Sequence, residues 1–324
     1  MSETLDLLVV GDLLVLDRVA ILDELPPIGS TALFSGLNKE LEQIHFGGCT
    51  ANVAAAACAL GLTVGLACFA GVDFESSGYC AHLDRLGITS RWLPVLKDQN
   101  IVQCYSFYDQ QGRKLSFMDW FDPLLSMKLQ LPDHVIKNSK RVVIVGGNRE
   151  GPISDSLLNV AITARKYQVP VALAWAGGVA EIEPRYMELV DMILCNDFEL
   201  KRILKYFGWD DDRAIFSLGP GIAYISSGTN GSHVYHDGNK VRVPAFERSQ
   251  AMDPTGAGDS YAGGVLTGFE WGKAPEVCGR IGSIVSSFVV EKKGCQTNLP
   301  SHEMLEERYH AAYGEEINAS IADR

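Results

Sequence analysis

Short apolar runs alternate along the chain with segments in which apolar residues recur at helical spacing. The run Leu5–Val10 is apolar throughout and ends at Gly11, which predicts a buried strand. Further strands are expected at Leu14–Leu22, Thr31–Ile44, Thr63–Phe69, Val142–Val145, Val169–Ala174, Met192–Cys195 and Ile222–Ser226, followed by a small meander to Val243. Helices are expected at Ala51–Leu60, Glu75–Leu86, Ser154–Tyr167, Asp197–Phe207, Ala257–Phe269, Pro275–Val290 and Ser301–Tyr313.

The order of these elements predicts the fold class. Strands and helices alternate through the second half of the chain, which favours right-handed crossovers and a parallel sheet, and so an α/β fold class. The β-rich stretch 14–46 is expected to lie partly outside that sheet, and a hairpin that turns at Asp109–Gly112 is expected within 100–120. We therefore predict one domain over residues 1–313 and a disordered tail at 314–324.

A glycine pair, Gly47-Gly48, precedes an alanine-rich helix. Thr50 is a candidate N-cap for Ala51–Leu60, and Gly61 would end the helix. Residues 51–72 carry no charge for a length that could span a bilayer. Because the pattern changes from helix to strand at Gly61, we expect no membrane-spanning segment there.

The most informative stretch is Ala251–Gly264, which reads Ala-Met-Asp-Pro-Thr-Gly-Ala-Gly-Asp-Ser-Tyr-Ala-Gly-Gly. Asp253-Pro254 ends the preceding element, and a small, apolar helix follows. Gly256, Ala257 and Gly258 are placed where a helix leaves its first N–H groups free, and such groups attract phosphate. Asp259 follows in the first turn, so the sequence predicts a phosphate cradle beside a carboxylate.

Other polar clusters follow strands and should meet the cradle at the carboxyl edge of the sheet. Asn196 and Glu199, three residues apart at a helix start, could face a hydrated Mg²⁺ or could form a capping box, and the sequence favours the two equally. Ser227, Gly228 and Gly231 form either a plain hairpin turn or a nucleotide contact.

Two carboxylates lie near the first strand. Asp12 and Asp17 either cap and solvate the strand ends or, for one of them, bind a substrate hydroxyl, because an unpaired acidic residue in an apolar stretch is costly.

Composition excludes some partners. The 324-residue chain has 28 basic and 40 acidic residues, a net charge of −12, and basic residues never occur more than two in a row. Nucleic acid and anionic membrane surfaces are therefore not expected as partners. None of the eight cysteines forms a Cys-x-x-Cys pair, which predicts reduced thiols and a cytoplasmic protein.

These motifs together resemble the PfkB carbohydrate kinase family, also called ribokinase-like. Asp253–Gly264 is similar to its C-terminal signature almost residue for residue, and Gly47–Asn52 with the following alanines is similar to its N-terminal signature. Asn196-x-x-Glu199 resembles the family's Mg²⁺-water motif, and Ser227-Gly228-x-x-Gly231 resembles its nucleotide-contact turn. The similarity covers roughly residues 5–300, in the family's order.

The resemblance implies a fold: a doubly wound, mostly parallel α/β sheet flanked by helices, with a small β lid contributed by about 14–46 and 100–120. It also implies a set of roles. Asp259 would be the base that accepts the substrate's hydroxyl proton, and the Gly256–Gly258 amides would form the anion hole. Gly47, Gly48, Asn52 and an N-terminal aspartate would hold substrate hydroxyls. The family usually places that aspartate five residues after the first glycine, whereas Gly11 and Asp17 are six apart and Asp12 competes, so both stay candidates.

The expected activity is ATP- and Mg²⁺-dependent transfer of the γ-phosphoryl group to a hydroxyl of a small sugar. The first alternative is an adenosine-like nucleoside kinase of the same family, with Phe117, Trp120 and Phe121 as candidate contacts for the base. The second is a non-catalytic nucleotide-binding protein with the same fold. A homodimer through exposed lid edges and a monovalent-cation site near Asp253 and Gly294 complete the expectations.

Overall fold

The structure is a computed structural model that describes residues 4–27, 29–31, 33, 35–111, 113–119, 127–146, 151–175, 184–246 and 251–317. The strands of one sheet are β1 (Leu5–Leu13), β4 (Val64–Phe69), β7 (Ser139–Val145), β8 (Val171–Ala174), β9 (Met192–Asn196), β10 (Ile222–Ser226), β11 (Ser232–His236) and β12 (Asn239–Val243). Those of a second, smaller sheet are β2 (Val15–Leu22), β3 (His45–Gly47), β5 (Val102–Asp109) and β6 (Lys114–Met118). The helices are α1 (Leu37–Glu42), α2 (Cys49–Ala59), α3 (Tyr79–Leu86), α4 (Asp133–Lys137), α5 (Gly151–Lys166), α6 (Asp197–Phe207), α7 (Ala257–Glu270), α8 (Pro275–Val289) and α9 (His302–Tyr313), with short 3-10 helices at Pro184–Tyr186, Asp212–Leu218 and Gly228–Asn230.

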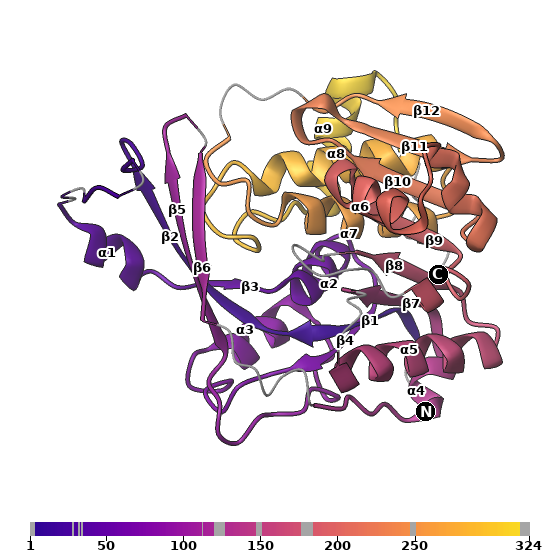
Figure 1. Cartoon of the computed structure of the whole chain (residues 1–324), viewed down its shortest axis with the longest axis horizontal. Coiled ribbons are helices and arrows are strands. Elements are labelled where there is room, and N and C mark those ends of the chain that lie inside the picture. The colour runs from indigo at the N-terminus through magenta and orange to yellow at the C-terminus, as the bar shows by residue number, and fades with distance from the viewer. Residues whose placement is uncertain are drawn as a thin grey trace.

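The large sheet has the strand order β12-β11-β10-β9-β8-β7-β1-β4, and the pairs from β10 to β4 are all parallel. Helices cover both faces (Figure 1). One core lies between the sheet and α4, α5 and α6, and the other between the sheet and α2, α3, α7 and α8. Strand β1 is buried almost throughout because Leu8 and Val10 enter the first core while Leu7 and Val9 enter the second. The predicted doubly wound α/β fold is confirmed.

The small sheet is the predicted lid. Its order is β3-β2-β5-β6, with β2 and β5 parallel and the outer pairs antiparallel. It projects from one end of the large sheet (Figure 1). Its strands come from the two segments, near 14–46 and 100–120, that the sequence assigned to a lid.

The strand expected over Thr31–Ile44 is wrong in its central part. Residues Leu37–Glu42 form helix α1, and only His45–Gly47 pair with β2. Leu37 and Leu41 are half-buried while Lys39 and Glu42 are exposed, which is a helical period rather than the alternation of a strand. Arg18 on β2 donates a hydrogen bond from its Nη1 to the carbonyl oxygen of Leu41 in this helix, at 2.5 Å.

Helix α2 begins earlier than predicted. Gly48, not Thr50, is the N-cap residue, with φ 98°, and Thr50 lies inside the helix, 3% exposed. A Cβ on Gly48 would lie 2.8 Å from the carbonyl oxygen of Leu13, so only glycine allows the chain to turn this closely past β1.

Strand β1 contains a bulge at Gly11 and Asp12. Val10 pairs with Ala67 and Leu13 with Phe69, so three steps along β1 match two along β4. A bulge adds one residue to a strand without shifting the rest of the pairing. The extra residue between Gly11 and Asp17 is therefore absorbed in β1, and β2 begins in register with the lid.

The sequence predicted a disordered tail at 314–324 and no membrane-spanning segment at 51–72. Ile317 is 4% exposed and packs with Leu305 and Tyr309, so the packed part extends beyond 313 to at least this residue, and 318–324 lie outside the described residues. Within the described parts of the chain, helices long and apolar enough to cross a bilayer are not found.

Helices α2 and α7 cross at very short range. A Cβ on Gly263 of α7 would lie 2.6 Å from the Cβ of Ala56 and 2.9 Å from the carbonyl oxygen of Val53. The alanines of α2, Ala54 to Ala57, are fully buried along this contact. Small residues on both helices thus set the distance between their N-termini.

We predict that Gly263→Ala destabilises the fold by about 1–3 kcal/mol, because the added methyl overpacks the crossing. Helix propensity alone predicts the opposite sign, a gain of up to about 1 kcal/mol. Urea unfolding measures the change. Gly221→Ala is the control, since its Cβ would lie 3.9 Å from the nearest atom and should change stability by less than about 0.5 kcal/mol. An unchanged or raised unfolding free energy in Gly263→Ala would contradict the crossing described here.

Candidate active site

Helix α7 begins in the glycine-rich loop, as the sequence predicted. Gly256 is its N-cap residue, with φ 77°, and a Cβ there would lie 2.7 Å from the Cβ of Cys295. The Ala257 N–H donates to the carbonyl of Pro254 at 3.2 Å, so it is used within the turn. Gly258 and Asp259 follow in the first turn, where N–H groups have no intrahelical acceptor.

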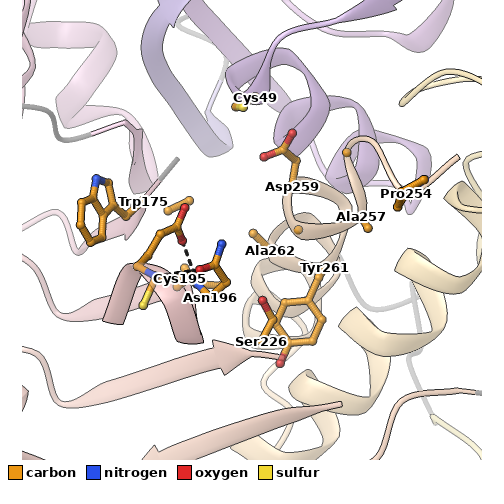
Figure 2. A pocket seen from close by; sticks show the side chains of 15 residues that line it. Cys49, Trp175, Cys195, Asn196, Ser226, Pro254, Ala257, Asp259, Tyr261 and Ala262 are labelled. Atoms are coloured by element: carbon orange, nitrogen blue, oxygen red, sulfur yellow. Dashed lines mark hydrogen bonds between the residues drawn. The ribbon is translucent and has the colours of Figure 1, made fainter. Parts of the chain in front are cut away.

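A cavity of about 290 Å³ opens at this helix start (Figure 2). Asp259 points toward Cys49 at the start of α2, and Trp175, Cys195 and Asn196 lie across the cavity from it. The lining residues are Cys49, Ala174, Trp175, Leu194, Cys195, Asn196, Glu199, Ser226, Pro254, Gly256, Ala257, Gly258, Asp259, Tyr261 and Ala262. Burial raises the pKa of Asp259, while hydrogen bonds from Asn52 and Cys49 and the charge of Lys114 act against that rise.

A second cavity of about 500 Å³ adjoins the first, with Gly258 and Tyr261 among the residues that line both. Its size is that of a small-molecule site. Gly228 and Gly231 line it, whereas Ser227 is not among its lining residues. The Ser227 N–H donates to the carbonyl of Gly231 at 2.7 Å, so the turn predicted as the simpler alternative is present as well.

Asn196 and Glu199 form a complete capping box at the start of α6. The Asn196 Oδ1 accepts the Glu199 N–H at 2.8 Å, and the Glu199 Oε2 accepts the Asn196 N–H at 2.8 Å. Glu199 also lines the first cavity, and it is only 8% exposed. Burial, with a contribution from the charge of Asp259, raises the pKa of Glu199 to about 7. The capping interpretation is therefore confirmed, and the Mg²⁺ interpretation stays a prediction.

The bulge in β1 separates the two candidate aspartates. Asp17 lies on lid strand β2 with its Oδ2 against Gly47, where a Cβ would come within 1.9 Å of that oxygen. Cys295 Sγ donates to the same Oδ2 at 3.5 Å. Asp12 lies at the end of β1 beside Gly146. Burial raises the pKa of each carboxyl to about 6.

The lid has one face toward the site and one away from it. Asp17 pairs with Cys104, and Cys104 pairs with Met118, so these three side chains share a face. Phe117 pairs with Tyr105 on the opposite face, and its ring packs against Phe107. Phe117 is therefore not a contact for a substrate on the Asp17 side; Trp120 and Phe121, the other aromatic candidates, lie outside the described residues.

Asp253 ties two loops together beneath the site. Its carboxylate accepts the Thr255 N–H at 3.0 Å and the Gly294 N–H at 2.9 Å, and it is 1% exposed. Tyr108 on the lid also hydrogen-bonds the Thr255 hydroxyl. One buried carboxylate thus joins the glycine-rich loop to the segment after α8, and the Thr255 hydroxyl joins that loop to the lid.

Asn52 lies between the two helix starts. Its Nδ2 donates to the Asp259 Oδ2 at 2.8 Å, and the side chain is 4% exposed. Among the described residues, no group of three or more His, Cys, Asp and Glu side chains is arranged to enclose a metal ion. A site of the Mg²⁺ type with few protein ligands would use single carboxylates such as Glu199.

Sequence reasoning missed several residues of this region. Trp175 lines the first cavity, and Tyr261 lines both. Lys114 bears the positive charge that acts on Asp259 and Asp17. Tertiary packing alone brings Trp175 and Lys114 to the site, whereas Tyr261 lies within the stretch Ala251–Gly264 that the sequence singled out.

Comparisons with known proteins agree with this geometry. Residues 7–302 match the pfkB family carbohydrate kinases. A nucleoside kinase from Methanothermobacter thermautotrophicus is 31% identical over 322 residues, covering 98% of this chain and 99% of that protein. The solved nucleoside kinase of Methanocaldococcus jannaschii, an archaeal member of the ribokinase family, superposes with a TM-score of 0.77 at 24% identity, covering 96% and 100% of the two chains.

A second solved structure, the Burkholderia thailandensis nucleoside kinase in complex with inosine, gives a TM-score of 0.77 at 21% identity, covering 96% of this chain and 99% of the other. The match of the family over nearly the whole chain, together with the signature loop at the start of α7, establishes the activity class. The chain belongs to the pfkB family of carbohydrate kinases and is a ribokinase-like, ATP-binding phosphotransferase that uses an alcohol group as acceptor.

Proposed function

We propose that this protein is a nucleoside kinase that transfers the γ-phosphoryl group of ATP to a primary hydroxyl of a nucleoside. The observation that carries the proposal is the near full-length similarity to a nucleoside kinase at 31% identity. The small sugar expected first from the sequence is supported only by more distant relatives, and membership of the family sets aside the non-catalytic alternative.

Asp259 is the proposed base. Its carboxylate stands at the junction of the helix start and the cavity, held by Asn52, in a position to accept the proton of the acceptor hydroxyl. The hydroxyl oxygen then bonds to the γ-phosphorus, and the bond from that phosphorus to the bridging oxygen of ADP breaks. Positioning and charge stabilisation account for most of the catalysis in such a transfer.

The N–H groups at the start of α7 are the proposed donors to the transferring phosphoryl group. Gly258 is the best placed, because it lines both cavities and a Cβ on it would meet no atom within 4 Å. Gly256 shapes the turn by its positive φ. The second cavity, with Gly228 and Gly231, is the proposed site for the rest of the nucleotide.

Mg²⁺ fits the donor set of the first cavity. Glu199 offers a nearly buried carboxylate there, next to the phosphate site, and would hold the ion through water. When bound, the ion supplies charge neutralisation for the polyphosphate. A monovalent cation near Asp253 and Gly294 stays a prediction, as does the cytoplasmic location.

Asp17 is the proposed contact for the acceptor's hydroxyl groups, together with Gly47 and Gly48. It shares the lid's inner face with Cys104 and Met118, which offer an apolar surface to a base. Asp12 lies at the bulge in β1 and does not belong to this lid face.

The lid also supports the proposed homodimer. Strand β6 is at the edge of the small sheet, and Leu115, Phe117 and Met118 are 45%, 57% and 47% exposed. An exposed edge strand with apolar side chains is suited to pairing with a second copy.

Substrate class is tested with a panel of purine and pyrimidine nucleosides, ribose, fructose and a keto-sugar acid, each with ATP and Mg²⁺. We expect kcat/KM for at least one nucleoside to exceed that for ribose by about tenfold or more, and Asp259→Asn to lower that turnover by about 10²–10⁴-fold. A preference for a free sugar would contradict the substrate proposal, and near-normal turnover of a folded Asp259→Asn would contradict the base.

The anion site is tested by two glycine variants in the same loop, one expected to change the KM for ATP and the other to change stability. Gly258→Ala should fold normally, because alanine suits a helix, yet raise the KM for ATP about tenfold or more by filling the space in front of the N–H groups. Gly256→Ala should instead lose about 1–3 kcal/mol of stability through strain at positive φ. An unchanged KM for ATP in Gly258→Ala would show that the nucleotide binds elsewhere.

Asp17→Asn should raise the KM for the nucleoside about 10–100-fold, since a hydrogen bond to a charged group contributes about 1.5–3 kcal/mol. The KM for ATP should stay unchanged. Asp12→Asn is the matched comparison, and steady-state kinetics of both variants decide between the two carboxylates. A larger effect on the nucleoside from Asp12→Asn would reverse the assignment.

A further inference from the structure

A chain of buried amide side chains leads away from Asp259. Gln296 Nε2 donates to the Asn52 Oδ1 at 2.9 Å, and Asn52 Nδ2 donates to the Asp259 Oδ2 at 2.8 Å. His82 Nε2 lies 2.8 Å from the Gln296 Oε1. Gln296 and Asn52 are 7% and 4% exposed, so water does not offer them alternative partners.

The direction of every hydrogen bond in this chain follows from its last member. An ionised carboxylate only accepts, so Asn52 must present its amide nitrogen to Asp259 and its oxygen to Gln296. Gln296 must then present its nitrogen to Asn52, which leaves its own oxygen toward His82. His82 must therefore carry a hydrogen on Nε2.

We propose that Gln296 and His82 are positioning residues for the catalytic base: through Asn52 they fix which amide group faces Asp259 and so keep its carboxylate ionised and oriented. This inference rests on the proposed role of Asp259. It assigns to Asn52, expected from the family resemblance to hold substrate, a second contact that points at the base.

His82 and Gln296, at the far end of this hydrogen-bonded amide chain, are held in place by further contacts. The ring of Phe46 stacks on His82, with centroids 4.3 Å apart and planes 21° apart. Tyr79 OH donates to the Gly47 carbonyl at 2.5 Å and accepts from the Gln296 Nε2 at 3.3 Å. Because these contacts fix the histidine ring and the glutamine, the donor order does not depend on a mobile side chain.

Charge at His82 is not required for this role. Burial lowers the pKa of His82, and the nearby Arg85 adds to this, while the bond to Gln296 acts in the opposite direction. Both the neutral Nε2–H form and the protonated form donate from Nε2. The order of donors is therefore kept across the pH range in which the histidine titrates.

Other ionisable groups also face Asp259, and a test must hold them constant. They come from four different parts of the chain: Cys49 on α2, Glu199 on α6, Lys114 on β6 and Cys295 after α8. Variants at Gln296 and His82 keep all four residues. Because Gln296→Glu adds a charge of its own, the uncharged variants Gln296→Leu, His82→Leu and His82→Gln isolate the amide chain.

The experiment compares the pH dependence of kcat/KM for the nucleoside that the enzyme phosphorylates, in wild type, Gln296→Glu and Gln296→Leu. A carboxylate at position 296 makes Asn52 turn its amide nitrogen away from Asp259, which then loses a donor to its ionised form. The acid limb of the pH profile, where kcat/KM rises as Asp259 ionises, should therefore move up by about one pH unit or more. Leucine removes the donor without reversing the amide, and its shift should be smaller and in the same direction. The KM for ATP should stay within about twofold.

Two variants at His82, one that removes the Nε2–H donor and one that restores it, test the far end of the amide chain. His82→Leu leaves the Gln296 oxygen without a donor and should shift the limb upward, whereas His82→Gln restores an N–H at the Nε2 position and should return the limb toward wild type. Melting temperatures measured alongside identify changes that come only from packing.

Asp259→Asn is assayed in parallel to separate the two proposals. If its turnover is near normal, the base assignment fails and the positioning role fails with it. If its turnover collapses while the acid limb of Gln296→Glu stays at the wild-type pH, the base assignment stands and the positioning role is overturned, whatever the melting temperatures.

Discussion

The close crossing of α2 and α7 is the constraint on which the site depends. Gly263 meets Ala56 and Val53 without a side chain between them, and this brings the first turns of two helices to one place. Asn52 from one turn then reaches Asp259 in the other at 2.8 Å. A wider crossing would leave the carboxylate without its neutral donor, in a cavity where burial already raises its pKa.

Negative charge accumulates around this crossing. Burial raises the pKa of Asp12 and Asp17 to about 6 and that of Glu199 to about 7. For a carboxyl whose pKa is raised by folding, the native state binds protons more tightly than the unfolded chain, so stability is lost as the pH rises through the folded pKa. Near neutral pH the folded protein therefore holds these carboxylates ionised at a cost in stability, and a cation bound at the proposed site would offset that cost. The ionised carboxylates that the proposed function needs therefore lower the stability of the fold.

Local sequence signals predicted most of the architecture. Apolar runs and glycine stops located β1, α6 and β10 closely, because a buried parallel strand and a capped helix are set by neighbouring residues. The same signals failed at Thr31–Ile44, where few apolar residues distinguish a short helix from a strand. They also assigned the N-cap of α2 to Thr50, because the close approach of Gly48 to β1 is a tertiary contact.

The sequence predicted the candidate site only where the functional residues are neighbours in the sequence. Gly256, Gly258 and Asp259 form one continuous motif, and the motif places them at one helix start. Which aspartate faces the lid depended on a bulge that only the register of β1 against β4 reveals. Gln296 and His82 lie 214 positions apart in sequence and meet through folding, so no spacing rule could connect them.

The most direct test of the account is a crystal structure of the ternary complex with a nucleoside and a non-hydrolysable ATP analogue with Mg²⁺. We expect the acceptor hydroxyl to lie about 2.6–3.2 Å from a carboxylate oxygen of Asp259, and the terminal phosphate to accept hydrogen bonds from the N–H groups of Gly258 and Asp259. A polyphosphate bound away from the start of α7, or an acceptor hydroxyl that faces another carboxylate, would contradict it.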